Sequence, residues 1–115
     1  MRAFDHIGIP TDERRPGELF VEATRVWITD PARHPQRIEY LRFEPDTPVS
    51  GPVRHLPHVA FRVENLDTEA AQGEILLGPF HATDTLRVVF VLIDGAVFEF
   101  MESSVPGHWF PVREK

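Results

Sequence analysis

The segment PHVAFRV at residues 57–63 decides how this sequence is interpreted, because it repeats the pattern of DHIGIPT at residues 5–11. In both segments a histidine, His6 or His58, is followed by a β-branched aliphatic residue and then by glycine or alanine. Short runs with alternating apolar side chains are typical of β-strands. A strand that recurs in this way indicates a fold built from two related modules.

A second pair of segments repeats in the same order along the chain. RIEYLRF at residues 37–43 and VFEFMES at residues 97–103 each place a glutamate inside an apolar run. Each half of the chain therefore begins with a histidine strand and ends with a glutamate strand. The four candidate functional residues are, in chain order, His6, Glu39, His58 and Glu99.

The rest of the chain has the composition of short strands joined by turns. Its 11 prolines limit long helices, and Asp94-Gly95 predicts a tight hairpin. The stretch 65–72 predicts a helix, with Asn65 or Asp67 able to cap its first turn. The predicted strands cover residues 4–10, 19–24, 25–29, 37–44, 57–63, 74–80, 85–93 and 96–102.

The two modules are expected to share one sheet in a single domain spanning residues 1–115. Module one covers about residues 1–48, a proline-rich linker about 45–57, module two about 57–104, and a tail 105–115. Module one is shortened, because DERRPG at residues 12–17 forms one helical turn at most. We expect Trp109 and Phe110 of the tail, or a partner subunit, to cover the apolar surface left by the missing helix.

A metal ion would explain glutamates placed in apolar strands. A carboxylate buried there without a partner is costly, and a cation offsets that cost. Two imidazoles and two carboxylates suit a divalent ion such as zinc, nickel, cobalt, manganese or iron(II). On an octahedral ion these four ligands leave two positions open for a substrate that chelates through two neighbouring oxygens.

Strand alternation also permits a simpler arrangement. Phe98 and Phe100 could face the core while Glu99 points to solvent, and Glu39 could do the same. By the same alternation Asp5, on the strand of His6, is expected on the face opposite that histidine. The repetition of all four positions favours the metal site over the solvent-facing alternative.

The motif strands FDHIGIPT, RIEYLRFE, LPHVAFRV and DGAVFEFME make the whole chain resemble the vicinal oxygen chelate superfamily, the fold of glyoxalase I, methylmalonyl-CoA epimerase and extradiol dioxygenases. The resemblance implies an α+β fold of two βαβββ modules, whose eight strands form a curled mixed sheet around a central cleft. Here the first module has little or no helix. The resemblance also implies that His6, Glu39, His58 and Glu99 are the metal ligands, and that the protein is a homodimer.

Three functions fit this pattern. The first is a metal-dependent lyase or isomerase of glyoxalase type, in which Glu39 or Glu99 takes a proton from a chelated small molecule. The second is a non-catalytic protein that binds or sequesters small molecules. The third is a dioxygenase, which needs three open metal positions and so conflicts with a second glutamate ligand. Arg62, Trp27 and Phe43 are candidate substrate-binding residues, with a rim salt bridge for the arginine and ordinary core packing for the two aromatics as the alternatives.

Composition excludes several other classes. A formal charge of −6, from 12 basic and 18 acidic residues, gives no basic excess for nucleic-acid binding. Without cysteine there is no thiol nucleophile or iron–sulfur cluster. No apolar run reaches the roughly 20 residues of a membrane span and no secretory signal is recognisable, so we expect a cytoplasmic protein. The remaining histidines are expected at the surface: His34, His55, His81 and His108.

Overall fold

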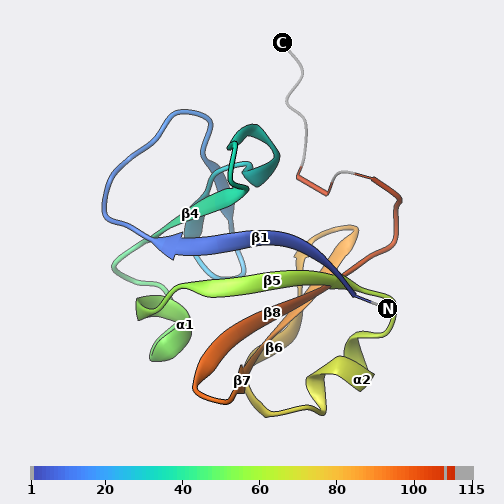
Figure 1. Cartoon of the computed structure of the whole chain (residues 1–115). Coiled ribbons are helices and arrows are strands. Elements are labelled where there is room, and N and C mark those ends of the chain that lie inside the picture. The colour runs from blue at the N-terminus through green and yellow to red at the C-terminus, as the bar shows by residue number, and fades with distance from the viewer. Residues whose placement is uncertain (1, 108, 111–115) are drawn as a thin grey trace.

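The computed structural model describes residues 2–107, 109 and 110, and its centre is one curled mixed sheet (Figure 1). The strands lie in the order β2-β3-β4-β1-β5-β8-β7-β6. Their bounds are β1 (Arg2–Pro10), β2 (Leu19–Val21), β3 (Val26–Ile28), β4 (Ile38–Phe43), β5 (His58–Val63), β6 (Glu74–Thr83), β7 (Leu86–Ile93) and β8 (Ala96–Ser103).

The strand order shows two modules with the same internal arrangement. In the first module β1 pairs in parallel with β4, and in the second β5 pairs in parallel with β8. The other pairs within each module are antiparallel. The modules join where β1 and β5 run antiparallel at the middle of the sheet. The predicted α+β fold, an eight-stranded curled mixed sheet, is confirmed.

Helices are few and short, as the prolines predict. Helix α2 (Leu66–Ala70) begins at Asn65, whose side chain accepts the backbone N–H of Thr68 at 3.1 Å. It falls within the predicted 65–72 but is shorter. The described part of module one has no α-helix, only a 3-10 turn, η1 (Pro31–Arg33). None of these helices has the length and apolar character that a membrane span requires.

One helix was not expected from the sequence. The predicted linker contains α1 (Pro52–His55), a single turn with proline at its first position. Proline is tolerated there because the first helical N–H groups have no intrahelical partner. The turn buries Val53 toward the cleft, so the linker contributes to the core.

Apolar side chains cover both faces of the sheet. Inside the curl, residues of both modules form one cluster, which includes Val26, Leu41 and Val88. On the outer face Leu66 and Ala70 of α2 pack with Phe100 and its neighbours in module two. Burying such side chains contributes roughly 25 cal/mol per Å² of apolar surface.

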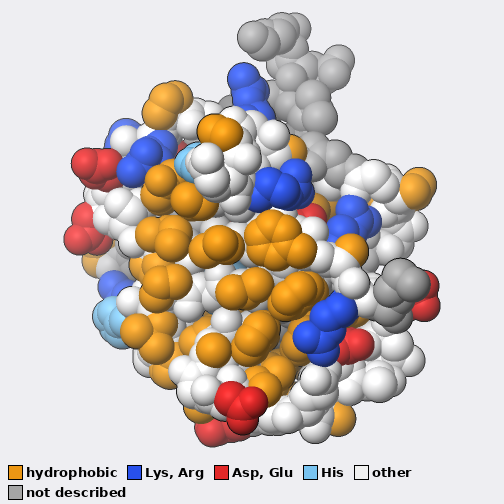
Figure 2. Space-filling model, in the orientation of Figure 1, with side chains coloured by type: hydrophobic (Ala, Val, Ile, Leu, Met, Phe, Trp, Pro, Cys, Tyr) orange, Lys and Arg blue, Asp and Glu red, His pale blue; other side chains and the backbone are white. Residues whose placement is uncertain are grey.

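On the outer face of the sheet, no α-helix of the described chain covers module one or the middle strands. Figure 2 shows hydrophobic side chains gathered over β1, β5 and β8 on this face. Ile7 of β1 pairs with Val59 of β5, which pairs in turn with Phe98 of β8, and all three are half-buried. Phe4 is 48% exposed. This continuous apolar surface lies opposite the cleft.

Candidate metal centre

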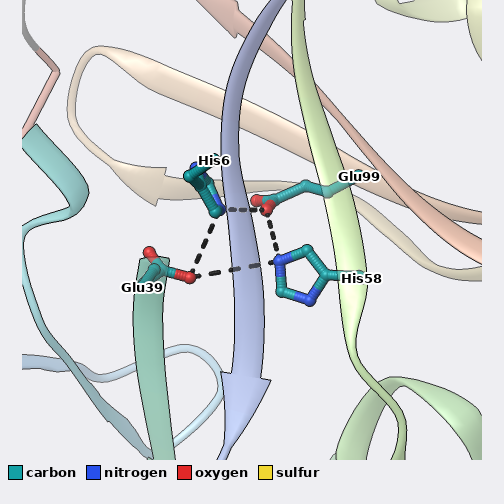
Figure 3. Close-up of side chains that lie close together, drawn as sticks. All are labelled: His6, Glu39, His58 and Glu99. Atoms are coloured by element: carbon teal, nitrogen blue, oxygen red, sulfur yellow. Dashed lines mark ion pairs between the residues drawn. The ribbon is translucent and has the colours of Figure 1, made fainter. Parts of the chain in front are cut away.

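Four neighbouring strands at the middle of the sheet each supply one side chain to the cleft (Figure 3). His6 comes from β1, Glu39 from β4, His58 from β5 and Glu99 from β8. The strand register explains the convergence. Glu39 and His58 both lie opposite Gly8, while Ala60 lies opposite both His6 and Glu99. Two ligand candidates therefore come from each module.

The potential ligand atoms are close enough to share one ion. Glu99 Oε1 lies 3.1 Å from His58 Nε2 and 3.2 Å from His6 Nε2. Glu39 Oε1 lies 3.4 Å from His6 Nε2 and 4.0 Å from His58 Nε2. One ligand atom from each residue can be chosen so that all lie within 4.8 Å of one another. Atoms bound at about 2.1 Å to one ion are separated by roughly 3–4 Å, which matches these distances.

Burial and hydrogen bonding favour a cation at this point. His6 is 0% exposed, and His58, Glu39 and Glu99 are 2%, 4% and 7% exposed. Nevertheless Nε2 of His6 and both ring nitrogens of His58 have no hydrogen-bond partner among the described residues, because the nearby carboxylates are not aligned to accept. Buried polar atoms without partners are costly and uncommon. A divalent ion would satisfy both Nε2 atoms and both carboxylates, so the residues fit a metal.

The charges of the cluster also favour a cation at this point. Burial lowers the pKa of His6, but the Glu39 charge and the hydrogen bond with Asp5 outweigh it and hold that pKa well above its usual value. Burial raises the pKa of Glu99, but the adjacent His58 and His6 outweigh it and hold the pKa at about 2. The Glu99 carboxylate therefore stays ionised and needs positive charge beside it. A metal ion or protons on the imidazoles can supply it.

Asp5 supports His6 from behind, which corrects the expectation that it lies on the opposite face. A β-bulge between Phe4 and His6 breaks the alternation, so the side chains of Asp5 and His6 turn to the same side of the strand. His6 Nδ1 lies 2.7 Å from Asp5 Oδ2, and Trp109 Nε1 donates to the same oxygen at 2.8 Å. Because an ionised carboxylate only accepts, Nδ1 carries a proton, and Nε2 is the nitrogen that would bind a metal in exchange for any proton it holds.

Replacing Asp5 by asparagine is expected to weaken divalent-metal binding about 10- to 100-fold. The variant keeps the shape of the side chain but removes the charge that makes the His6 imidazole a stronger ligand. Titration of zinc against a chromophoric chelator measures the change. Asp12→Asn, on the exposed loop after β1, is the matched control and should leave the affinity unchanged. Equal zinc affinities for both variants would rule out this supporting role.

The approach of β1 to His58 explains why the first repeat has a glycine two positions after its histidine. An ideal Cβ placed on Gly8 would lie 2.0 Å from His58 Cε1, well inside contact distance. Any side chain at this position would displace the imidazole. At the equivalent position of module two, Ala60 is completely buried.

Of the three predicted substrate-binding residues, one lines the cavity and two lie elsewhere. Phe43 lines the cavity, but Trp27 does not, because alternation along β3 turns Val26 and Ile28 inward instead. The Trp27 indole donates to Glu44 Oε2 at 2.7 Å on the other face. Arg62 lies on the same face of β5 as His58, but its guanidinium donates to the carbonyl oxygens of Val105 and Gly107. These bonds attach the tail to β5. Neither Trp27 nor Arg62 is among the residues that line the cavity.

The tail aromatics are buried as expected, but in another place. Trp109 and Phe110 are 5% and 8% exposed, and they belong to the cluster inside the curl. The Trp109 ring lies 5.9 Å from the His6 imidazole, centroid to centroid. The tail therefore lines the inside of the curl and leaves the outer face of module one uncovered in the described chain. Sequence patterns gave no indication of this, since the contact joins segments far apart in the chain.

The other histidines stand apart from the cluster. His55 and His81 are exposed and His34 is half-buried, and none belongs to the group of potential ligands in the described chain. His108 lies outside the described residues.

A cavity extends from the two glutamates into the curl. Its empty volume is about 480 Å³, open mouth included. The walls come from both modules, from α1 and from the tail. Its lining residues are Val21, Thr24, Val26, Ile28, Glu39, Leu41, Phe43, Val49, Val53, Leu77, Phe80, Ala82, Leu86, Val88, Phe90, Glu99 and Trp109.

Comparison with known proteins supports the fold and gives no function. The structure is similar to the crystal structure of hypothetical protein BH1468 from Bacillus halodurans C-125, with a TM-score of 0.61 and 16% sequence identity. The match covers 93% of this chain and 98% of that one. No family model matches the sequence, and no curated protein matches it significantly.

Proposed function

We propose that the protein is a metal-dependent enzyme of the vicinal oxygen chelate type, a lyase or isomerase acting on a small molecule that chelates through two neighbouring oxygens. The observation that carries this proposal is the buried cluster of two histidines and two glutamates, whose imidazole nitrogens facing the carboxylates have no hydrogen-bond partner in the described part of the chain. The cavity that begins at this cluster supports it, because it gives a substrate access to the same point.

His6, Glu39, His58 and Glu99 would hold the ion. A divalent metal supplies Lewis acidity, which stabilises negative charge that develops on a chelated oxygen. The residue that takes the proton must reach the carbon next to that oxygen. Both glutamates line the cavity, and Glu39 is the better candidate base because its carboxylate lies farther from the imidazoles than that of Glu99 does. Asp5 keeps His6 oriented throughout.

The proposal predicts metal-dependent exchange of a carbon-bound proton. Protein loaded with zinc, nickel, cobalt or manganese, incubated in D₂O with small α-hydroxyketones and α-hydroxy acids, should incorporate deuterium next to the chelated oxygens. Nuclear magnetic resonance of the small molecule measures the exchange. Chelator-treated protein and the Glu39→Gln variant should show at least a hundredfold slower exchange. Exchange that is equally fast without metal would contradict the proposal.

A binding protein of the same fold is the second candidate. It is favoured by one observation, namely that Glu39 and Glu99 are the only ionisable side chains among the described residues that line the cavity. Such a protein would bind metal and ligand stoichiometrically without any proton exchange. A dioxygenase is less well supported, because Glu39 lies in the cluster and would occupy a position that this chemistry needs open.

The expected homodimer and the cytoplasmic location stay predictions. The apolar outer face over β1, β5 and β8 is consistent with a second copy packing there, since contiguous exposed apolar surface often marks an interaction site.

A further inference from the structure

We infer that the cavity selects substrates whose body, beyond the chelating oxygens, is small, apolar and uncharged. This inference rests on the proposed function, because the chelating end is placed at the cluster of His6, Glu39, His58 and Glu99. It concerns a different part of the same site, namely the walls that a bound molecule meets away from the metal.

The first argument is the chemistry of the walls. Apart from the two glutamates at one end, the lining side chains are aliphatic or aromatic, with Thr24 as the one other polar residue among those described. Trp109 also presents its ring, since its indole N–H donates to Asp5. A polar group on the ligand would lose its hydration here without gaining a partner, which costs roughly 1–3 kcal/mol or more.

The second argument is charge. No lysine or arginine is among the described residues that line the cavity. Arg62 lies on the same face of β5 as His58, but its guanidinium donates to the backbone carbonyl oxygens of Val105 and Gly107 in the tail. The positive charge of a divalent ion would already be balanced by Glu39 and Glu99. A second anionic group, such as a phosphate or a distal carboxylate, would therefore be buried unpaired.

The third argument is size. The empty volume of about 480 Å³ includes the open mouth, so the space that the walls enclose is smaller than that. Val53 of α1 and Trp109 of the tail are among the residues that line the cavity. These walls suit a compact ligand better than one joined to a large carrier group.

Three hydroxamic acids test chelation at the metal separately from selection for an apolar body, because all three chelate zinc through the same pair of oxygens. Acetohydroxamic acid carries only the chelating end, hexanohydroxamic acid adds an apolar chain, and adipic acid monohydroxamate is that chain ending in a carboxylate. Calorimetric titration of zinc-loaded protein should give a hexanohydroxamate affinity at least about tenfold above that of acetohydroxamate. The adipic compound should bind no more tightly than acetohydroxamate.

The outcomes are distinguishable. If none of the three compounds binds protein that demonstrably holds zinc, chelation fails and the proposed function fails with it. If acetohydroxamate binds but the hexano and adipic compounds bind equally tightly, chelation stands and the apolar selection is overturned.

A cavity-filling variant tests whether the apolar chain of hexanohydroxamate occupies this cavity. Ala82 lines the cavity from β6, so Ala82→Phe should remove the roughly tenfold advantage of hexanohydroxamate and leave acetohydroxamate binding unchanged. Ala96→Phe, the same change at an exposed position of β8, is the control and should alter neither affinity. Retained zinc stoichiometry shows that each variant is folded. An undiminished advantage in folded Ala82→Phe would place the chain elsewhere and overturn the inference.

Discussion

Replacing Glu99 by glutamine should weaken divalent-metal binding by at least about a hundredfold, the largest effect expected of any single change in this protein. The Glu99 carboxylate faces both imidazoles, at 3.1 and 3.2 Å, and glutamine keeps its size while removing its charge. An amide oxygen is a much poorer ligand than a carboxylate for the metals that imidazole also suits. Titration of zinc or nickel in competition with a chelator measures the change.

Glu102→Gln is the matched control for this experiment. It makes the same change on the same strand, but Glu102 is paired with Arg87 at 3.2 Å and lies away from the cluster. Its metal affinity should equal that of the unchanged protein. Since the pKa of Glu99 is about 2, the carboxylate is ionised at every pH between 5 and 8, and the difference between the two variants should persist across that range. Equal affinities of the two variants would show that Glu99 is not a ligand.

Replacing Gly8 by alanine should destabilise the metal-free protein by about 1–3 kcal/mol and also weaken metal binding. The added Cβ would lie 2.0 Å from Cε1 of His58 and 2.4 Å from its Nε2, so the imidazole must leave its position. The backbone of Gly8 is outside the left-handed region, and so alanine meets no conformational penalty there. The whole effect therefore comes from the contact with His58. Urea denaturation monitored by circular dichroism measures the stability.

A double-mutant cycle isolates that contact. In a His58→Ala background the space next to Gly8 is free, so Gly8→Ala should lower the free energy of unfolding by much less than it does in the unchanged protein. Stability loss that is the same in both backgrounds would mean that the glycine is needed for another reason. The cycle is performed on metal-free protein, so that loss of the ligand His58 does not enter the comparison.

The sequence predicted the fold well because the evidence for it was local and repeated. Alternating apolar runs indicated all eight strands, and the paired histidine and glutamate strands indicated the two modules. The capping residue Asn65 indicated α2. Helix α1 was missed because a single turn has no periodicity to recognise, and its proline content was typical of a loop.

The candidate site was predictable only in part. His6, Glu39, His58 and Glu99 are brought together because each sits at an equivalent place on a strand next to the centre of the sheet. Asp5 was assigned to the wrong face because a bulge is not visible in a period-two pattern. The roles of Trp109 and Arg62 depend on where the tail returns, which is a long-range contact that no local pattern encodes.

The division of the four ligand candidates between the modules has a consequence for folding. His6 and Glu39 belong to one half of the chain, His58 and Glu99 to the other, and the halves meet along β1 and β5. An ion held by all four would therefore be a cross-link between halves that each lack a complete site. Its binding free energy would become available only after the halves dock, so metal supply would favour assembly of the sheet over either half alone. A chain deprived of metal would lose this cross-link at the junction of β1 and β5, where the two halves meet.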